Sequence, residues 1–252
     1  MSVIINPKKK IGFLGFPKTA SSYMENLLLE YNEFTLKEPP SEIYDIRIND
    51  KNCFRKMIID DGVSVFNLDD TYNDYIFFSI TRNPYERFLS GFLFLKGKEF
   101  KIDNKKIKDK YICGPNMSKS SYTIDLPQGN TLNEMSLDEI IYNKVNLNSY
   151  HYGHLFMIQS DYLKNLNHKV EIIKLENLKK ELPIVLEKFN LVFPNLNDKD
   201  DYNPHQTIKL YEIDNYYTDN SLQFVNNYFS DDFTRFGYTK FSTMEEMAAY
   251  YN

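Results

Sequence analysis

Charged and hydroxyl-bearing side chains gather in residues 16–22, which read FPKTASS. Lys18 brings a positive charge, and Thr19, Ser21 and Ser22 bring hydroxyl donors. A loop that opens a helix also directs backbone N–H groups and the positive end of the helix dipole towards one point. These residue types therefore predict a site for an anion such as phosphate. The alternative is an ordinary strand-to-helix turn with a solvated lysine.

The spacing in this stretch is close to the phosphate-binding pattern G-x-x-x-x-G-K-[ST]. Residues 12–19 read GFLGFPKT, so Gly12, Lys18 and Thr19 match the pattern, while Pro17 stands where the second glycine is expected. We interpret the stretch as a relative of the nucleoside-triphosphate loop that has a stiffer entry and a lysine still placed to meet a phosphate.

A second group of phosphate-binding side chains follows an apolar run, in residues 79–91, SITRNPYERFLSG. Arg82 comes where the run ends, and its planar guanidinium can bind a phosphate through two parallel hydrogen bonds. Arg87 and Ser90 are three residues apart, so they share one face of the helix that follows. Ser90 can add a hydroxyl donor. The alternative is that Arg82 pairs with a nearby carboxylate such as Glu86.

These side chains need a scaffold, and the hydrophobic pattern predicts one. Apolar runs predict strands over residues 11–16, 63–68, 75–81 and 170–175. Helical periodicity predicts a helix that ends at about residue 30, one that begins at Pro84, and two more over 178–190 and 242–251. A further helix is predicted over 136–144, because Ser136 and Glu139 form a capping box. Another is predicted over 219–229, with Asp219 or Asn220 as its cap. Alternating strands and helices favour a mainly parallel central sheet covered on both faces, with ligands at the carboxyl ends of the strands.

Composition limits the other possibilities. The chain has 252 residues and a net charge of −5, which argues against a general nucleic-acid binder. The two cysteines, Cys53 and Cys113, are expected to be reduced thiols. There is no signal-peptide core and no run of about 18 apolar residues, so we expect a cytoplasmic protein without a membrane span. We expect one domain over residues 1–252, with a substrate-side excursion at about 96–149 and a tail at 242–252.

The strand over 75–81 ends in Thr81-Arg82, with no aspartate. A kinase or triphosphatase needs a carboxylate to hold Mg²⁺, whereas an arginine suits a phosphate without a metal. This favours a donor other than Mg·ATP. No cluster of cysteine, histidine and carboxylate residues has metal-ligand spacing, so no metal is expected.

Several segments together resemble the sulfotransferases that use 3′-phosphoadenosine 5′-phosphosulfate (PAPS). The order along the chain is that of the family, and the resemblance covers about residues 11–238. The segments are PKTASS (17–22), RNPYERFLSGF (82–92), HLFMIQSDYL (154–163), VEIIKLENLKKELPIVLEKFNL (170–191) and YFSDDFTRFGY (228–238). The closest branch is the carbohydrate-type, Golgi-like and bacterial one. The chain departs from the family pattern at Ala20, where glycine is usual, and by a one-residue shift between His154 and Gln159.

The resemblance implies an α/β fold with the three-layer architecture of P-loop nucleoside-triphosphate hydrolases. It also implies a role for each matching residue. Lys18 would contact the bridging oxygen and the 5′-phosphate, while Arg82 and Ser90 would bind the 3′-phosphate. Arg87 would brace its helix or assist with that phosphate. The implied cofactor site comprises Pro17, Lys18, Thr19, Ala20, Ser21, Ser22, Arg82 and Ser90.

The acceptor hydroxyl needs a general base, and histidine has a suitable pKa. His151 and His154 are the candidates, while Glu38, Glu42 and Asp45 remain alternatives.

The acceptor implied by the resemblance is a hydroxyl-bearing small molecule or a glycan. The alternative functions are a P-loop-type kinase and a non-catalytic protein of the same fold that binds an anion or the product, 3′-phosphoadenosine 5′-phosphate (PAP). His168 lies in a polar turn and is expected to be solvated. The oligomeric state stays open.

Overall fold

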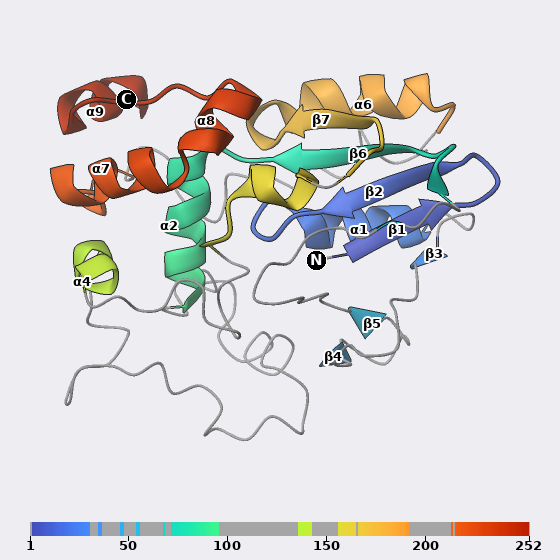
Figure 1. The fold of residues 1–252 in the computed structure, drawn as a ribbon, viewed down its shortest axis with the longest axis horizontal. Helices are drawn as coiled ribbons and strands as arrows, with labels where there is room; N and C mark the ends of the chain where they lie inside the picture. The colour runs from blue at the N-terminus through green and yellow to red at the C-terminus, as the bar shows by residue number, and fades with distance from the viewer. Residues whose placement is uncertain are drawn as a thin grey trace. The chain divides into compact units, whose positions relative to one another are not determined.

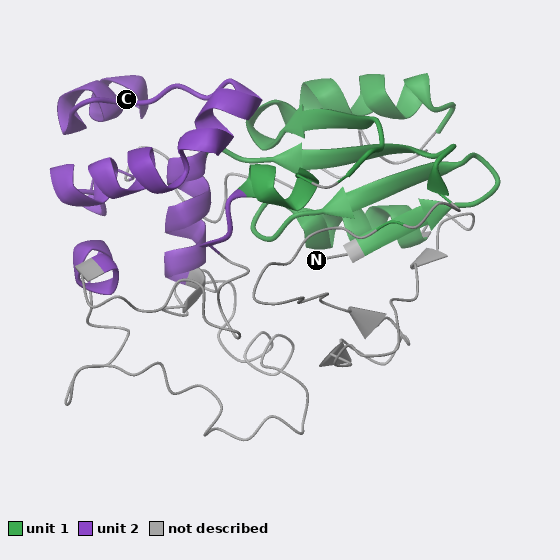
Figure 2. Ribbon diagram, in the orientation of Figure 1, with its two compact units in different colours: residues 1–45, 54–83, 159–204 green, residues 46–53, 84–158, 205–252 purple. Residues whose placement is uncertain are grey.

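The structure is a computed structural model that describes residues 2–30, 35–36, 46–47, 54–55, 68, 72–95, 136–142, 156–164, 166–191, 213 and 215–251. The chain divides into two compact units (Figure 2). Unit 1 comprises residues 1–45, 54–83 and 159–204, and unit 2 comprises residues 46–53, 84–158 and 205–252. The prediction of a single domain over the whole chain stays a prediction.

Unit 1 contains a five-stranded sheet in the order β3-β1-β2-β6-β7 (Figure 1). Its strands are β1 (Ser2–Asn6), β2 (Ile11–Gly15), β3 (Thr35–Leu36), β6 (Ile76–Thr81) and β7 (Val170–Lys174). β6 runs parallel to both β2 and β7, whereas β1 runs antiparallel to both β2 and β3. The sheet is therefore mixed, and the prediction of a mainly parallel sheet is correct only for its β2-β6-β7 part.

The difference comes from β1, which is not among the predicted strands. β1 and β2 form a hairpin whose turn occupies residues 7–10. The Lys9 N–H donates to Asn6 Oδ1 at 3.0 Å, and Lys10 has a φ of 54°, which lets the chain reverse within four residues. The strands predicted over 11–16, 75–81 and 170–175 are confirmed as β2, β6 and β7. The strand predicted over 63–68 lies outside the described residues apart from Leu68.

The core of unit 1 lies on one face of this sheet. Alternate residues of β2 and β6 point to that face, and the Phe13 and Phe78 rings pack there with centroids 5.2 Å apart. The helices α1 (Ser21–Glu30) and α6 (Leu178–Lys188) both contribute leucines to the same buried cluster. The short helices η4 (Gln159–Leu163) and η5 (Leu175–Asn177) complete the described helices of the unit. A three-layer P-loop-like architecture stays a prediction.

Apart from one short strand, the elements that the structure describes in unit 2 are helices. Its helices are α2 (Pro84–Leu95), α4 (Leu137–Tyr142), α7 (Asp219–Tyr228), α8 (Ser230–Phe236) and α9 (Met244–Tyr251). Aromatic side chains dominate its core, where the Phe88 ring packs against Phe156 at 5.2 Å and against Phe229 at 5.8 Å. β4 (Ile46–Arg47) and β5 (Phe54–Arg55) are two further short strands outside the main sheet.

The helix caps agree with the prediction in one case and correct it in another. The Ser136 capping box is present, because the Glu139 N–H donates to Ser136 Oγ at 3.2 Å and the Ser136 N–H donates to Glu139 Oε2 at 2.6 Å. At α7, however, the cap is Thr218 rather than Asp219 or Asn220. Thr218 completes a reciprocal box with Ser221, whose Oγ accepts the Thr218 N–H at 2.8 Å.

Candidate anion-binding site

The loop between β2 and α1 has an unusual backbone. Lys18 has a φ of 66° and Ala20 a φ of 62°, while Thr19 between them has a negative φ. When φ alternates in sign in this way, consecutive N–H groups converge on one point and form a concave site for an anion. The residues that contain the lysine and hydroxyl groups of the sequence motif therefore also have a backbone suited to bind phosphate.

Two left-handed residues that are not glycine represent strain, since each costs on the order of 1 kcal/mol relative to an ordinary conformation. The surrounding contacts hold the strain in place. Thr19 is fully buried, and its Oγ1 donates to the Phe16 carbonyl at 3.0 Å. The Ala20 carbonyl accepts the Met24 N–H at 3.1 Å and so begins α1. Such strained segments occur preferentially at ligand sites.

Arg82 lies against this loop within unit 1. It follows the last residue of β6, its side chain is buried, and its Nη1 donates to the Lys18 carbonyl at 3.4 Å. The two chemistry-bearing stretches of the sequence thus meet at the carboxyl ends of β2 and β6. There the Arg82 guanidinium lies beside the main chain of Lys18 in the loop.

The other motif residues belong to α2, in unit 2. Arg87 is 1% exposed, and its Nη1 donates to the Met157 carbonyl at 2.6 Å. This contact agrees with a bracing role for Arg87, here for the segment around Met157. Ser90 is also 1% exposed, and the next residue, Gly91, lies so close to Phe156 that an added Cβ would sit 2.9 Å from the ring.

The predicted general bases His151 and His154 lie outside the described residues, as do Glu38, Glu42 and Asp45. His168 is described, and the expectation that it is solvated is wrong. Its ring lies edge-on to the Phe77 ring with centroids 5.3 Å apart, and both of its ring nitrogens are buried. His168 is thus a packing residue of the sheet.

Gln159 is a further residue of the site, for which no role is predicted from the sequence. It is fully buried at the start of η4, and its side-chain amide forms hydrogen bonds with both backbone groups of Arg82. The signal in the sequence was only that Gln159 belongs to one of the family-like segments.

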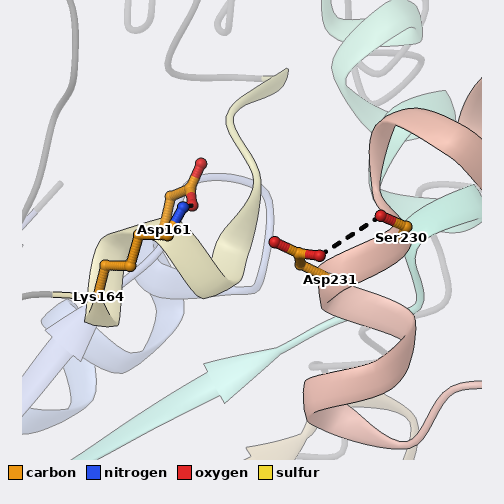
Figure 3. Close-up of polar contacts among 4 residues, drawn as sticks. All are labelled: Asp161, Lys164, Ser230 and Asp231. Carbon is orange, nitrogen blue, oxygen red and sulfur yellow. Dashed lines mark hydrogen bonds and ion pairs between the residues drawn. The ribbon is translucent and has the colours of Figure 1, made fainter.

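Two other polar contacts near the ends of short helices are local (Figure 3). In unit 1, Lys164 Nζ lies 2.7 Å from Asp161 Oδ1, with 64% of the lysine side chain exposed. In unit 2, Ser230 Oγ donates to Asp231 Oδ1 at 3.4 Å. Exposed pairs of this kind contribute little to stability.

Within the described ranges, no group of three or more histidine, cysteine or carboxylate residues could hold a metal ion. Across the same part of the chain, no helix is long and apolar enough to cross a membrane.

A family model described as the sulfotransferase family matches residues 1–239, which is almost the whole chain. No curated protein and no solved structure matches significantly. The matched region contains the strained loop, Arg82, α2 and the segment around Gln159. The chain belongs to the sulfotransferase family.

Proposed function

We propose that this sulfotransferase uses PAPS as its donor and transfers the sulfuryl group to a hydroxyl of a carbohydrate. One observation carries the choice of donor. The strained loop at 16–20 and the Arg82 guanidinium lie together at the carboxyl ends of two parallel strands, with Nη1 of Arg82 3.4 Å from the Lys18 carbonyl. A nucleotide with phosphates on both its 5′ and 3′ positions needs two cationic groups near each other.

The donor set at this site fits such a nucleotide. The loop N–H groups and the start of α1 suit a phosphate, and the Ser21 and Ser22 hydroxyls extend the donor set by the first residues of the helix. Lys18 is the group that would offset charge on the leaving oxygen, as the resemblance implies. Arg82 would bind the 3′-phosphate. When bound, PAPS supplies the sulfuryl group.

Sulfuryl transfer requires two contributions from this chain, charge stabilisation and proton removal. The leaving oxygen gains negative charge, which cationic and N–H groups placed in advance can stabilise. The acceptor hydroxyl must lose its proton to a base, for which His151 and His154 are the proposed groups. We propose that no metal is required, since Lys18 and the loop backbone would offset the charge.

The first test is binding of PAP. A ligand present at about 100 times its Kd stabilises the folded state by about 2.7 kcal/mol, which for a chain of this size corresponds to a rise in Tm of roughly 5–10 °C. Mg·ATP at the same concentration serves as the competing ligand. No stabilisation by PAP would refute the proposal, and turnover of Mg·ATP with indifference to PAP would establish the kinase alternative.

The second test is transfer from labelled PAPS to a panel of sugars, glycans and phenols. Lys18→Ala should abolish transfer while the protein still folds, because the variant removes charge stabilisation at the leaving group. Lys164→Ala is the matched control, since Lys164 is largely exposed and pairs with Asp161. Binding of PAP without transfer to any acceptor, and without an effect of His151→Ala or His154→Ala, would indicate a non-catalytic binding protein.

A further inference from the structure

Arg82 stands beyond the hydrogen-bond ladder of the sheet. The pairing of β6 with β7 ends at Thr81 and Lys174, and its pairing with β2 ends at Ser79 and Leu14. Arg82 is nevertheless buried, at 3% exposure. Buried backbone N–H and C=O groups must find partners, so its main chain needs partners from outside the sheet.

The side chain of Gln159 supplies both partners. The Arg82 N–H donates to Gln159 Oε1 at 2.9 Å, and Gln159 Nε2 donates to the Arg82 carbonyl at 2.9 Å. Both bonds are buried, and Gln159 has no exposed surface. The amide therefore replaces a neighbouring strand at this one residue and fixes its backbone, from which the arginine side chain projects.

The next peptide group is held in a similar way. The Asn83 N–H donates to Glu176 Oε1 at 2.6 Å, and Glu176 lies in η5 directly after β7. Two side chains from separate elements thus hold consecutive peptide groups where β6 ends. This arrangement leaves little freedom in the direction of the Arg82 side chain.

The helix that contains Gln159 also supports the loop. Tyr162, three residues further along η4, stacks on Phe16 with ring centroids 5.1 Å apart and an interplanar angle of 18°. Both rings are fully buried, and Phe16 lies two residues before Lys18, the first of the strained residues. η4 therefore contacts both halves of the candidate site, the loop through Tyr162 and Arg82 through Gln159.

We propose that Gln159 is a positioning residue that holds the Arg82 guanidinium in place for the 3′-phosphate of the bound nucleotide. This proposal rests on the proposed function, and it assigns to Gln159 no contact with the nucleotide. Without the amide, the Arg82 backbone would rotate to find other partners for its N–H and C=O groups. The guanidinium would then leave its place beside the Lys18 carbonyl.

The test compares two ligands in calorimetric titrations, PAP and adenosine 5′-phosphate, which lacks the 3′-phosphate. Gln159→Met keeps a similar length and volume but can neither donate to nor accept from the Arg82 backbone as the amide does. Loss of a charge-assisted contact to phosphate should weaken PAP binding on the order of tenfold, with adenosine 5′-phosphate changed less than about twofold. Lys164→Ala, directly after the same short helix, should leave both affinities unchanged.

The outcomes separate the two claims. If the wild type shows no preference for PAP over adenosine 5′-phosphate, the proposed function fails. If the wild type shows the preference and Gln159→Met keeps it, the positioning role is overturned. It is also overturned if both ligands weaken equally, since that marks a merely structural role. Should Gln159→Met not fold, Gln159→Asn, which is shorter by one methylene, decides by the same ratio.

Discussion

Replacing Ala20 by glycine should stabilise this protein. Ala20 has a φ of 62°, in the left-handed region that costs an L-residue about 1–2 kcal/mol. Glycine adopts this region without that cost. It also increases the conformational entropy of the unfolded chain, however, which lowers the free energy of unfolding by about 0.4–1 kcal/mol. The midpoints of these two ranges predict that Ala20→Gly increases the free energy of unfolding by about 0.8 kcal/mol.

For a chain of this size, 1 kcal/mol corresponds to roughly 2–4 °C in Tm, so the expected rise is about 1–4 °C by calorimetry. The matched control is Ala249→Gly, because Ala249 is exposed within α9. There the same substitution should lower stability by up to about 1 kcal/mol, since glycine is a poor helix former. The two variants therefore change Tm in opposite directions.

A fall in Tm for Ala20→Gly as large as that for Ala249→Gly would refute the reasoning. It would mean that Ala20 is not held in a left-handed conformation, and the concave backbone at 18–20 would lose its support. The same outcome would leave the usual glycine of the family at this position without a conformational explanation.

Two further predictions concern packing and pH. Gly12→Ala should destabilise by about 1–3 kcal/mol, because the new Cβ would lie 2.2 Å from Cε1 of the buried Phe77 ring, and a second change, Phe77→Leu, should restore part of the lost Tm. Burial raises the pKa of Tyr85 to about 12, above its unfolded value of about 10. The stability from the neutral phenol is thus complete below pH 10 and lost as the pH rises towards 12. Tyr85→Phe, which loses the hydrogen bond to Asn226, should lower stability at neutral pH but show a shallower alkaline decline in denaturant titrations. Equal alkaline slopes for wild type and variant would contradict this account.

The elements with a clear hydrophobic pattern could be predicted from the sequence. β2 and β6 are buried and apolar, and α1 and α2 repeat apolar residues at helical spacing, so local pattern and tertiary burial agree. β1 is not among the predicted strands, although Val3-Ile4-Ile5 is a β-branched run and Asn6-Pro7 is a turn signal. Its run of apolar residues is only three long, which is why the hairpin is missed. That one strand changes the sheet from mainly parallel to mixed.

Part of the candidate site could also be predicted from the sequence, and part could not. The chemistry of Lys18 and Arg82 is evident from their residue types, and the structure places the two residues at one edge of the sheet. The role of Gln159 could not be predicted, because it acts on backbone atoms of a residue 77 positions away. His168 looked solvated because its neighbours in sequence are polar, whereas its packing partner, Phe77, comes from β6, which is distant in sequence.

The backbone also changes how the loop motif aligns with a nucleoside-triphosphate loop. By residue types, the pattern fits residues 12–19 with Pro17 as the mismatch. However, β2 continues to Gly15, and Gly12 lies within this strand, paired with Phe77. The glycine of a phosphate loop stands where the strand ends, and the lysine stands where the helix begins. Gly12 and Lys18 occupy neither place, since α1 begins only at Ser21.

A shift of three residues gives a better structural fit. Gly15 then falls at the strand end, Ala20 at the place of the second glycine, and Ser21 and Ser22 at the start of the helix. The left-handed φ of Ala20 is what the second glycine would provide. Lys18 supplies its charge from the middle of the loop. The shifted alignment matches fewer residue types, so the sequence alone favoured the other.

The two alignments predict different results for Pro17→Gly. If residues 12–19 were the phosphate loop, this change would complete its pattern and should create binding of Mg·ATP. In the shifted alignment Pro17 is a buried loop residue, so the change only frees the unfolded chain and lowers stability by about 0.4–1 kcal/mol. We expect a lower Tm and no calorimetric signal with Mg·ATP. A gain of Mg·ATP binding would show that the glycine missing from this loop is at position 17 and not at position 20.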